Sequence, residues 1–232
     1  MKYLYLLSLV SLSFGSIRAQ EGFVGDGLDR SIKVFDANGK PFVNPPVDIE
    51  GTPFYKKEWK YGIIRLQDST VYKHIPLRLN LQNQEIHFLT VNKLEMSFPP
   101  GFVKEIIFSD SLKTPIEKYD FMCGFPRIDN QDENNFYRIL SDGKIKLLES
   151  LRTTIIIDKN DYSGEVNKEY RTYEDFYLFT GVSITRIKKD KGFYLDEMKS
   201  KRNEMENYFL NHKVNFKSSN DIQALIDFYN KL

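Results

Sequence analysis

The stretch Ile75-Pro76-Leu77-Arg78-Leu79-Asn80-Leu81 decides the fold, because every second residue in it is isoleucine or leucine. A period of two places these four side chains on one face of a β-strand and the intervening residues on the other. A proline cannot donate a hydrogen bond to a neighbouring strand, so Pro76 fits only at a sheet edge, a strand start or a bulge. The stretch therefore predicts a half-buried strand, with Pro76 at one of these three kinds of position.

The same alternation continues between Gly62 and Phe108, in short runs that turn residues separate. The turns lie at 82–84, 92–93 and 99–101. Short strands that follow each other through turns usually pair with their sequence neighbours, which indicates an antiparallel meander. The apolar positions of its strands are Ile63, Ile64 and Leu66, then Ile86, Phe88 and Val91, then Leu94, Met96 and Phe98, and finally the run Phe102–Phe108.

A second series of strands follows the polar break at Asp129–Asn134. Phe136–Leu140 and Lys144–Leu148 flank Asp142-Gly143, a dipeptide that is typical of tight hairpins. The polar interval 158–174 is predicted to be a solvent-exposed loop. Three further strands are indicated by β-branched and aromatic residues, over Thr153–Ile157, Asp175–Phe179 and Val182–Ile187.

The C-terminal tail changes to helical spacing. Asn220 and Gln223 resemble a capping box at the start of its second helix. Acidic and basic residues are mixed along both helices, which favours packing on the sheet over binding to a membrane surface. The apolar faces comprise Leu195, Met198, Met205 and Phe209 in the first helix and Ile222, Leu225, Ile226 and Tyr229 in the second.

These patterns predict an α+β fold that is mostly β. We expect an antiparallel β-meander, an open or partly closed sheet, with a C-terminal pair of amphipathic helices. Residues 20–61 are expected to form an N-terminal hairpin, with Asn38-Gly39 at its turn, and an extended connector. Residues 62–194 would form the β-rich body and 195–232 the helical pair packed on the sheet, with 20–232 as one structural unit.

Residues 1–19 have the pattern of a secretory signal peptide, with an early positive charge at Lys2 followed by an apolar run. Cleavage is expected after the small residue Ala19 or after Gly15. The apolar run is shorter than the roughly 20 residues that a membrane-spanning helix needs, and no later stretch reaches that length. The sequence therefore predicts an exported protein, periplasmic or extracellular, without a transmembrane segment in the mature chain.

The charge balance and the cysteine count narrow the possible partners. The chain has 33 basic and 32 acidic residues, which offers no electrostatic reason to bind nucleic acid. Cys123 is the only cysteine, so an exported chain would fold without an internal disulfide. Cys123 would serve as a nucleophile, as an intermolecular bridge or as a small buried residue, and its apolar neighbours Phe121 and Met122 favour burial.

The sequence carries no local signature of catalysis, and we predict no catalytic residues and no cofactor. A G-x-S-x-G motif, a glycine-rich phosphate loop and an H-E-x-x-H motif are all absent. Catalytic carboxylates that meet only in the folded protein leave no such pattern, because their separation in space defines them. A hydrolase of that kind therefore stays open as an alternative.

A partial metal-binding pattern lies in the predicted loop. Asp158, Asn160 and Glu169 match the first, third and twelfth positions of a calcium-binding EF-hand loop. Tyr162 stands at the fifth position, where an oxygen ligand is expected, and Ser163 stands where glycine is required. The three residues are candidate calcium ligands, but an ordinary solvated loop is the favoured interpretation.

Tyr55, Trp59 and Tyr61 form the densest aromatic cluster of the sequence. An exposed row of such rings would stack on sugars, whereas a buried one would close the end of the sheet. We take these three residues as candidate binding residues, although burial is favoured because aromatic side chains contribute most when they are desolvated.

Short segments spread over most of the mature chain are similar to a group of known sequences. They are Gly51–Tyr55, Glu58-Trp59, Gly62, Ile75–Asn80, Phe136-Tyr137, Asp142–Lys144 and Lys213–Leu232. Through these segments the chain resembles exported proteins of unknown function from Bacteroidota bacteria. The resemblance implies a periplasmic or extracellular setting and transfers no catalytic residue.

Three functions are consistent with these features. We favour a non-catalytic binding or assembly module of the bacterial cell envelope, with an envelope protein or a glycan as partner. The first alternative is an envelope hydrolase that acts on glycans through carboxylates not adjacent in sequence. The second is a carrier that encloses an apolar ligand in a curved sheet. A closed barrel with an empty interior would favour the carrier, and a polar cleft with two facing carboxylates would favour the hydrolase.

Overall fold

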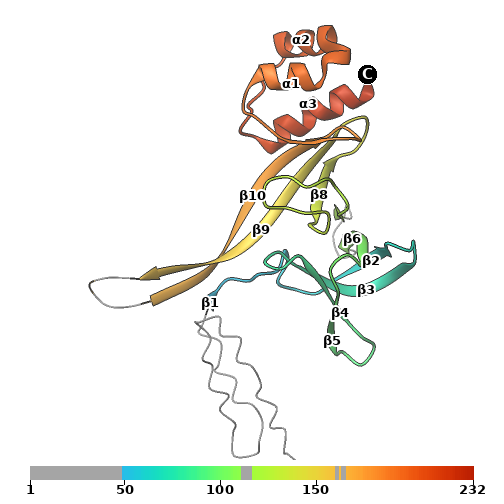
Figure 1. Cartoon of the computed structure of the whole chain (residues 1–232), viewed down its shortest axis with the longest axis vertical. Coiled ribbons are helices and arrows are strands. Elements are labelled where there is room, and N and C mark those ends of the chain that lie inside the picture. The colour runs from blue at the N-terminus through green and yellow to red at the C-terminus, as the bar shows by residue number, and fades with distance from the viewer. Residues whose placement is uncertain (1–48, 111–116, 160–161, 163–165) are drawn as a thin grey trace, which may run out of the picture. The chain divides into compact units, whose positions relative to one another are not determined.

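The computed structural model describes residues 49–110, 117–159, 162 and 166–232. The signal peptide and the hairpin predicted before residue 49 lie outside the described residues. In the described part, eleven strands form one open sheet, and three α-helices follow it (Figure 1). The strands are β1 (Ile49–Glu50), β2 (Lys60–Leu66), β3 (Val71–Asn80), β4 (Glu85–Leu89), β5 (Glu95–Phe98), β6 (Val103–Asp110), β7 (Glu117–Met122), β8 (Tyr137–Ser141), β9 (Lys146–Lys159), β10 (Val166–Phe179) and β11 (Ile184–Arg186).

The sheet is largely an antiparallel meander, which confirms the predicted fold class. Along the sheet the strands follow the order β1-β10-β9-β8-β7-β6-β2-β3-β4-β5, and β11 also pairs with β10. Among the described strands, only β1 pairs in parallel, with Ile49 opposite Lys168 of β10. The run β2–β5 joins the run β6–β10 where β2 pairs with β6. The order has two ends, so the sheet is open.

The decisive stretch forms the inner part of β3. Leu77 and Leu79 are fully buried, whereas Arg78 between them lies on the opposite face. Leu77 is paired with Phe88 of β4, and Leu79 is paired with Ile86. These residues belong to one apolar cluster that fills the inner face of the meander.

Pro76 lies next to a bulge, one of the three positions that the sequence allowed. The register between β2 and β3 shifts after Gly62, and His74 is the extra residue, with a positive φ of 57°. Gly62 itself is required by a close approach of β6, because a Cβ atom there would lie 2.7 Å from the carbonyl oxygen of Ile107.

Strands β9 and β10 form a continuous ribbon that the sequence did not predict. The two strands pair along their whole length, from Lys159 opposite Val166 to Lys146 opposite Phe179. The predicted loop over 158–174 is therefore wrong, since residues 166–174 belong to β10. Residues 166–174 are mostly polar because both faces of this part of the ribbon are largely solvated, and cross-strand pairs hold it to β9 instead of a core.

The C-terminal part contains three described α-helices where the sequence indicated two. They are α1 (Lys191–Glu197), α2 (Arg202–Asn211) and α3 (Ser219–Lys231), with a 3-10 turn at Lys199–Lys201 between the first two. The carboxylate of Asp190 caps α1 by accepting hydrogen bonds from the N–H groups of Gly192 and Phe193. The 3-10 turn at Lys199–Lys201 interrupts the segment that the spacing predicted as one helix.

The cap of α3 is Ser218 and not the predicted Asn220, which lies inside the helix. The hydroxyl of Ser218 accepts a hydrogen bond from the N–H of Asp221. Asp221 also places a negative charge in the first turn, where the helix dipole favours it.

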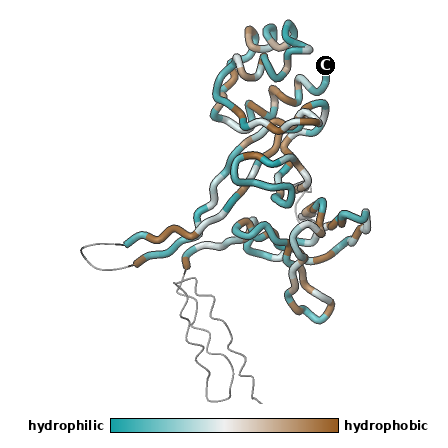
Figure 2. Tube along the Cα trace, viewed as in Figure 1, coloured by the Kyte–Doolittle hydropathy of each residue, from teal (hydrophilic) through white to brown (hydrophobic). Residues whose placement is uncertain are grey.

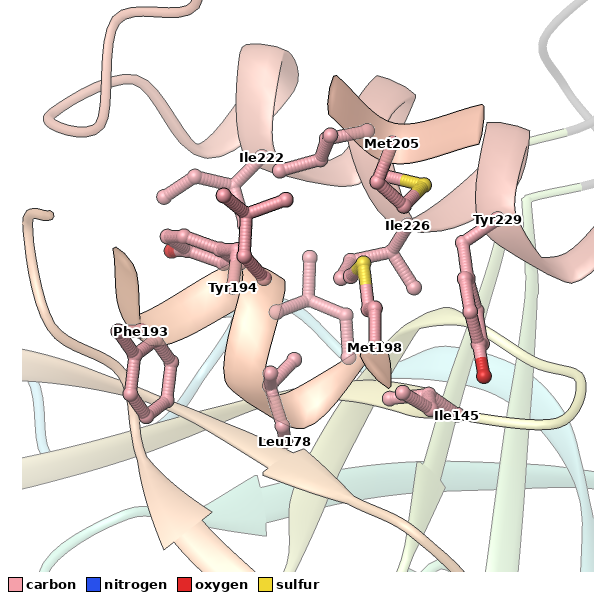
Figure 3. Packing of buried hydrophobic residues seen from close by; sticks show 12 residues of the cluster. Ile145, Leu178, Phe193, Tyr194, Met198, Met205, Ile222, Ile226 and Tyr229 are labelled. Atoms are coloured by element: carbon pink, nitrogen blue, oxygen red, sulfur yellow. The ribbon is translucent and has the colours of Figure 1, made fainter. Parts of the chain in front are cut away.

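The helices pack on the sheet through one apolar cluster (Figure 3). In Figure 3, Met198 and Ile226 face each other above Ile145 and Leu178 of the sheet hairpins. Asn230 of α3 fastens this contact, because its side chain accepts a hydrogen bond from the N–H of Ile145 and donates one to the carbonyl of Ile145.

The buried apolar residues of the described chain form three clusters, and β9 contributes to all of them. Leu147 belongs to the cluster under the helices. Leu148 belongs to a small cluster with Tyr137 and Tyr177. Leu151 packs against the cluster of the meander. A single strand thus links the packing of the whole described body.

Candidate interaction surface

The three candidate binding residues Tyr55, Trp59 and Tyr61 lie in different environments in the structure. Tyr55 is half-buried and packs into the meander cluster, where its ring meets Phe108 and Phe121. Its hydroxyl accepts a hydrogen bond of 3.2 Å from Nη1 of Arg138. Tyr55 therefore has a structural role in the core, in line with the favoured burial.

The ring of Trp59 makes a cation–π contact with the side chain of Arg78. The guanidinium carbon of Arg78 lies 4.0 Å from the centroid of the Trp59 ring and 4.0 Å from that of Phe54. Arg78 also donates to Glu95 at 2.9 Å, and Nδ1 of His87 lies 2.7 Å from the same carboxylate oxygen. Desolvation opposes ionisation of Glu95, but the hydrogen bonds from His87 and Arg78 hold its pKa below the usual value. Arg78 thus stacks on the ring of Trp59, one of the three candidate binding residues.

Tyr61 is half exposed and stacks on a different partner. Its ring lies parallel to the imidazole of His74, with 4.3 Å between the ring centroids. Tyr55, Trp59 and Tyr61 thus contact separate partners and do not form one row of rings. The sequence could not indicate this, because the bulge at His74 sets the position of Tyr61.

The candidate calcium ligands lie partly in strands. Asp158 is in β9 opposite Asn167, and Glu169 is in β10 opposite Ile156, where its carboxylate pairs with Arg171. Asn160 lies outside the described residues. Within the described ranges, no group of three or more metal-ligating side chains comes together. The calcium site stays a prediction, although Asp158 and Glu169 lie in strands and not in the loop on which the prediction was based.

Cys123 is buried, as favoured from the sequence. Its thiol donates to the carbonyl of Val103 at 3.1 Å. Burial raises the pKa of the Cys123 thiol to about 11, so the thiolate needed for nucleophilic attack is scarce at neutral pH.

Apolar side chains are exposed at the end of the β9–β10 ribbon. We call residues 153–159 of β9 and 166–172 of β10 the outer ribbon. Ile157 is 61% exposed and Val166 is 45% exposed, and Ile155 and Ile156 are only half-buried. Figure 2 shows this part of β9 as a hydrophobic stretch. Sequence reasoning missed this surface because it took residues 166–174 for a loop, although Val166, Tyr170 and Thr172 alternate as in a strand.

Within the described residues, the edge of β9 in the outer ribbon is open. Strand β8 pairs with β9 only as far as Ser150, and no other described strand continues on that side. The N–H of Thr153 donates across this edge to the carbonyl of Leu81. Orientation alternates along an antiparallel strand, so the N–H and C=O groups of Ile155 and Ile157 point the same way. The outer ribbon therefore presents backbone hydrogen-bonding groups and apolar side chains together.

A polar network centred on the buried Tyr177 holds the base of the ribbon. The hydroxyl of Tyr177 accepts a hydrogen bond from Gln131 at 3.0 Å and donates one to Asp129 at 2.8 Å. Burial raises the pKa of Tyr177, and the bond to Asp129 raises it further, so the phenol stays protonated. Two residues before Tyr177 in β10, Asp175 pairs with Arg152 of β9 at 3.1 Å. The two strands are thus fastened to the body and to each other where the outer ribbon begins.

A cavity of about 250 Å³ lies beside β10, β11 and the start of α3. Its lining includes Glu174, Asp175, Arg186, Lys189 and Lys217. The carboxylate of Asp175 pairs with Arg186, and Glu174 and Asp175 are consecutive residues of one strand, which directs them to opposite faces. Glu174 and Asp175 thus do not form the facing pair of carboxylates that is expected of a glycan hydrolase.

Comparison with family models, with curated proteins and with solved structures finds no match to this chain. Among the described helices, none is long and apolar enough to cross a membrane.

Proposed function

We propose that this protein is a non-catalytic binding or assembly module of the bacterial cell envelope and that the outer ribbon is its binding surface. The observation that carries the proposal is the open edge of β9 beside the exposed Ile157 and the half-buried Ile155 and Ile156. Natural proteins usually protect such edges with charges, prolines, bulges or covering elements, because an open edge pairs with strands of other chains. The run Thr153–Ile157 has neither a charge nor a proline.

Export is part of this proposal and rests on the sequence. Residues 1–19 carry the charge, the apolar run and the small terminal residue of a signal peptide. The resemblance to exported Bacteroidota proteins supports the same setting. We expect fractionation to find the protein outside the cytosol, with a mature N-terminus at Gln20 or Ser16. A protein that remains in the cytosol with residues 1–19 attached would contradict export.

The two alternative functions have less support. The sheet is open, and its inner face is filled by buried side chains, which does not favour a carrier with an empty interior. In the cavity beside β10 and β11, Asp175 is engaged by Arg186, and Glu174 and Asp175 are directed to opposite faces of the strand, which does not favour a glycan hydrolase.

The binding surface can be tested by photo-crosslinking in the producing cells. A photoreactive amino acid at Ile157 should form adducts, because this side chain lies beside the open edge. The same amino acid at Val182, which is 87% exposed but lies outside the outer ribbon, is the matched control. Adducts at position 157 that are absent at position 182 would support the proposal. Equal or absent crosslinking at both positions would contradict it.

A further inference from the structure

We infer that the outer ribbon binds a second copy of this chain, through antiparallel pairing of β9 with β9 of the copy about a twofold axis at Ile156. The inference rests on the proposed function, since it names the partner of the same surface. It joins two ribbons edge to edge into one continuous sheet, as in other modes of strand addition.

The symmetry of such a pair limits the register. A twofold axis between two antiparallel strands must place one residue opposite itself. With Ile156 on the axis, Ile155 lies opposite Ile157 of the copy, and Ile156 lies opposite Ile156. This is the register in which every isoleucine of the run lies opposite an isoleucine. Cross-strand pairs of this type stabilise a sheet.

The backbone groups favour the same register. The N–H of Thr153 is already bonded to Leu81, so the free part of the edge begins beyond this residue. Ile155 and Ile157 direct their N–H and C=O groups outward, and in the proposed register they bond to each other across the axis. Ile156 directs its groups to β10, so it forms the non-hydrogen-bonded pair on the axis.

The charges at the ends of the run are compatible with the pair. Lys159 lies opposite Thr153 of the copy, and Asp158 lies opposite Thr154. Asp158 is also diagonal to Arg152 of the copy, whose side chain is 40% exposed and of opposite charge. No like charges face each other directly, and like charges in that position would destabilise the pairing.

The first test is the mass of the purified protein in solution, measured by light scattering over a concentration series. The wild type should form a species of twice the monomer mass. Ile156→Lys should shift it to monomer, because the two copies would place like charges opposite each other on the axis. Val182→Lys adds the same charge at an exposed site outside the ribbon and should leave the dimer intact. A monomeric wild type, or a dimer that Ile156→Lys leaves unchanged, would overturn the inference.

A second test reads the register directly by cysteine crosslinking under a mild added oxidant. The Cα atoms of a non-hydrogen-bonded pair lie about 4.5 Å apart, which is within the range of a disulfide. Ile156→Cys should therefore yield a disulfide-linked dimer. Ile155→Cys and Ile157→Cys should each fail alone and should crosslink when the two proteins are mixed. The wild type, whose Cys123 is buried, is the control. Equal crosslinking of all three single variants would overturn the register.

The two proposals fail in distinguishable ways. If position 157 crosslinks only to a different protein while the purified chain is monomeric, the binding function stands and the second copy is excluded. If position 157 yields no adduct and the chain is monomeric, both proposals fail.

Discussion

Two buried tyrosines offer a matched test of how the base of the ribbon is held. Tyr137 of β8 and Tyr177 of β10 are both fully buried, and their ring centroids lie 5.7 Å apart at right angles. The hydroxyl of Tyr177 makes two hydrogen bonds, whereas that of Tyr137 has no partner within the described part of the chain. Burial raises the pKa of Tyr137 to about 12. The same substitution, Tyr→Phe, should therefore act oppositely at the two positions.

The expected magnitudes follow from the hydrogen bonds. Tyr177→Phe removes one bond to a carboxylate and one to an amide, and it leaves Gln131 buried without its partner. Bonds to charged groups contribute about 1.5–3 kcal/mol and neutral ones about 0.5–1.5 kcal/mol, so the free energy of unfolding should fall by roughly 2–4 kcal/mol. Tyr137→Phe removes a desolvated hydroxyl that bonds to nothing described, so it should be neutral or stabilise by up to about 1 kcal/mol.

Urea unfolding followed by circular dichroism measures both variants against the wild type. Equal slopes of the free energy against urea concentration would show that only stability has changed. The expected difference between the variants is at least about 2 kcal/mol, because both lose the same oxygen atom and differ only in its partners. Equal losses at the two positions would refute the reasoning and would mean that ring packing, and not the hydroxyl, sets the stability there.

Three further outcomes are expected. Gly143→Ala should lower the free energy of unfolding by roughly 1–3 kcal/mol, because the added Cβ would lie 2.5 Å from Cγ of Asn230. This loss should largely vanish when the same substitution is made in an Asn230→Gly background. If the loss persists there, a clash with Asn230 is not its cause. Desolvation raises the pKa of Glu149 against the pull of Arg138, so the folded state binds this proton more tightly than the unfolded state. The stability of the wild type relative to Glu149→Gln should therefore be highest below pH 4.5 and decline as the pH rises through the folded pKa; a relative stability that grows with pH would contradict this. The thiol of Cys123 should react with a thiol reagent at pH 8 only as fast as the protein opens, and rapid labelling of the native protein would contradict its burial.

The meander was predictable because one face of it is buried. Leu77 and Leu79 are fully buried, and their alternation with polar residues is the pattern that a half-buried strand imposes. The helices were predictable for the same reason, since Ile222, Leu225 and Ile226 all face the sheet. Where one face of an element is buried, its apolar residues recur with the period of that element, so the secondary structure can be predicted from the sequence.

The β10 part of the outer ribbon was not predictable in this way, because neither of its faces lies against a core. Residues 166–174 are mostly polar, and the pairing that makes them a strand depends on their partners in β9. The contact of Trp59 with Arg78 was equally hidden. It depends on the register of the meander, which brings together residues from a connector and from the middle of a strand. Contacts of this type leave no periodic trace in a single sequence.

The contribution of β9 to all three apolar clusters has a consequence for how the protein denatures. Leu147, Leu148 and Leu151 lie within five residues of one strand, yet each packs into a different cluster. Loosening of any one cluster disturbs the strand that the other two share. We therefore expect cooperativity across the whole described body, with helical and sheet signals lost in a single transition. Separate melting of the C-terminal helices would show that the shared strand does not couple them.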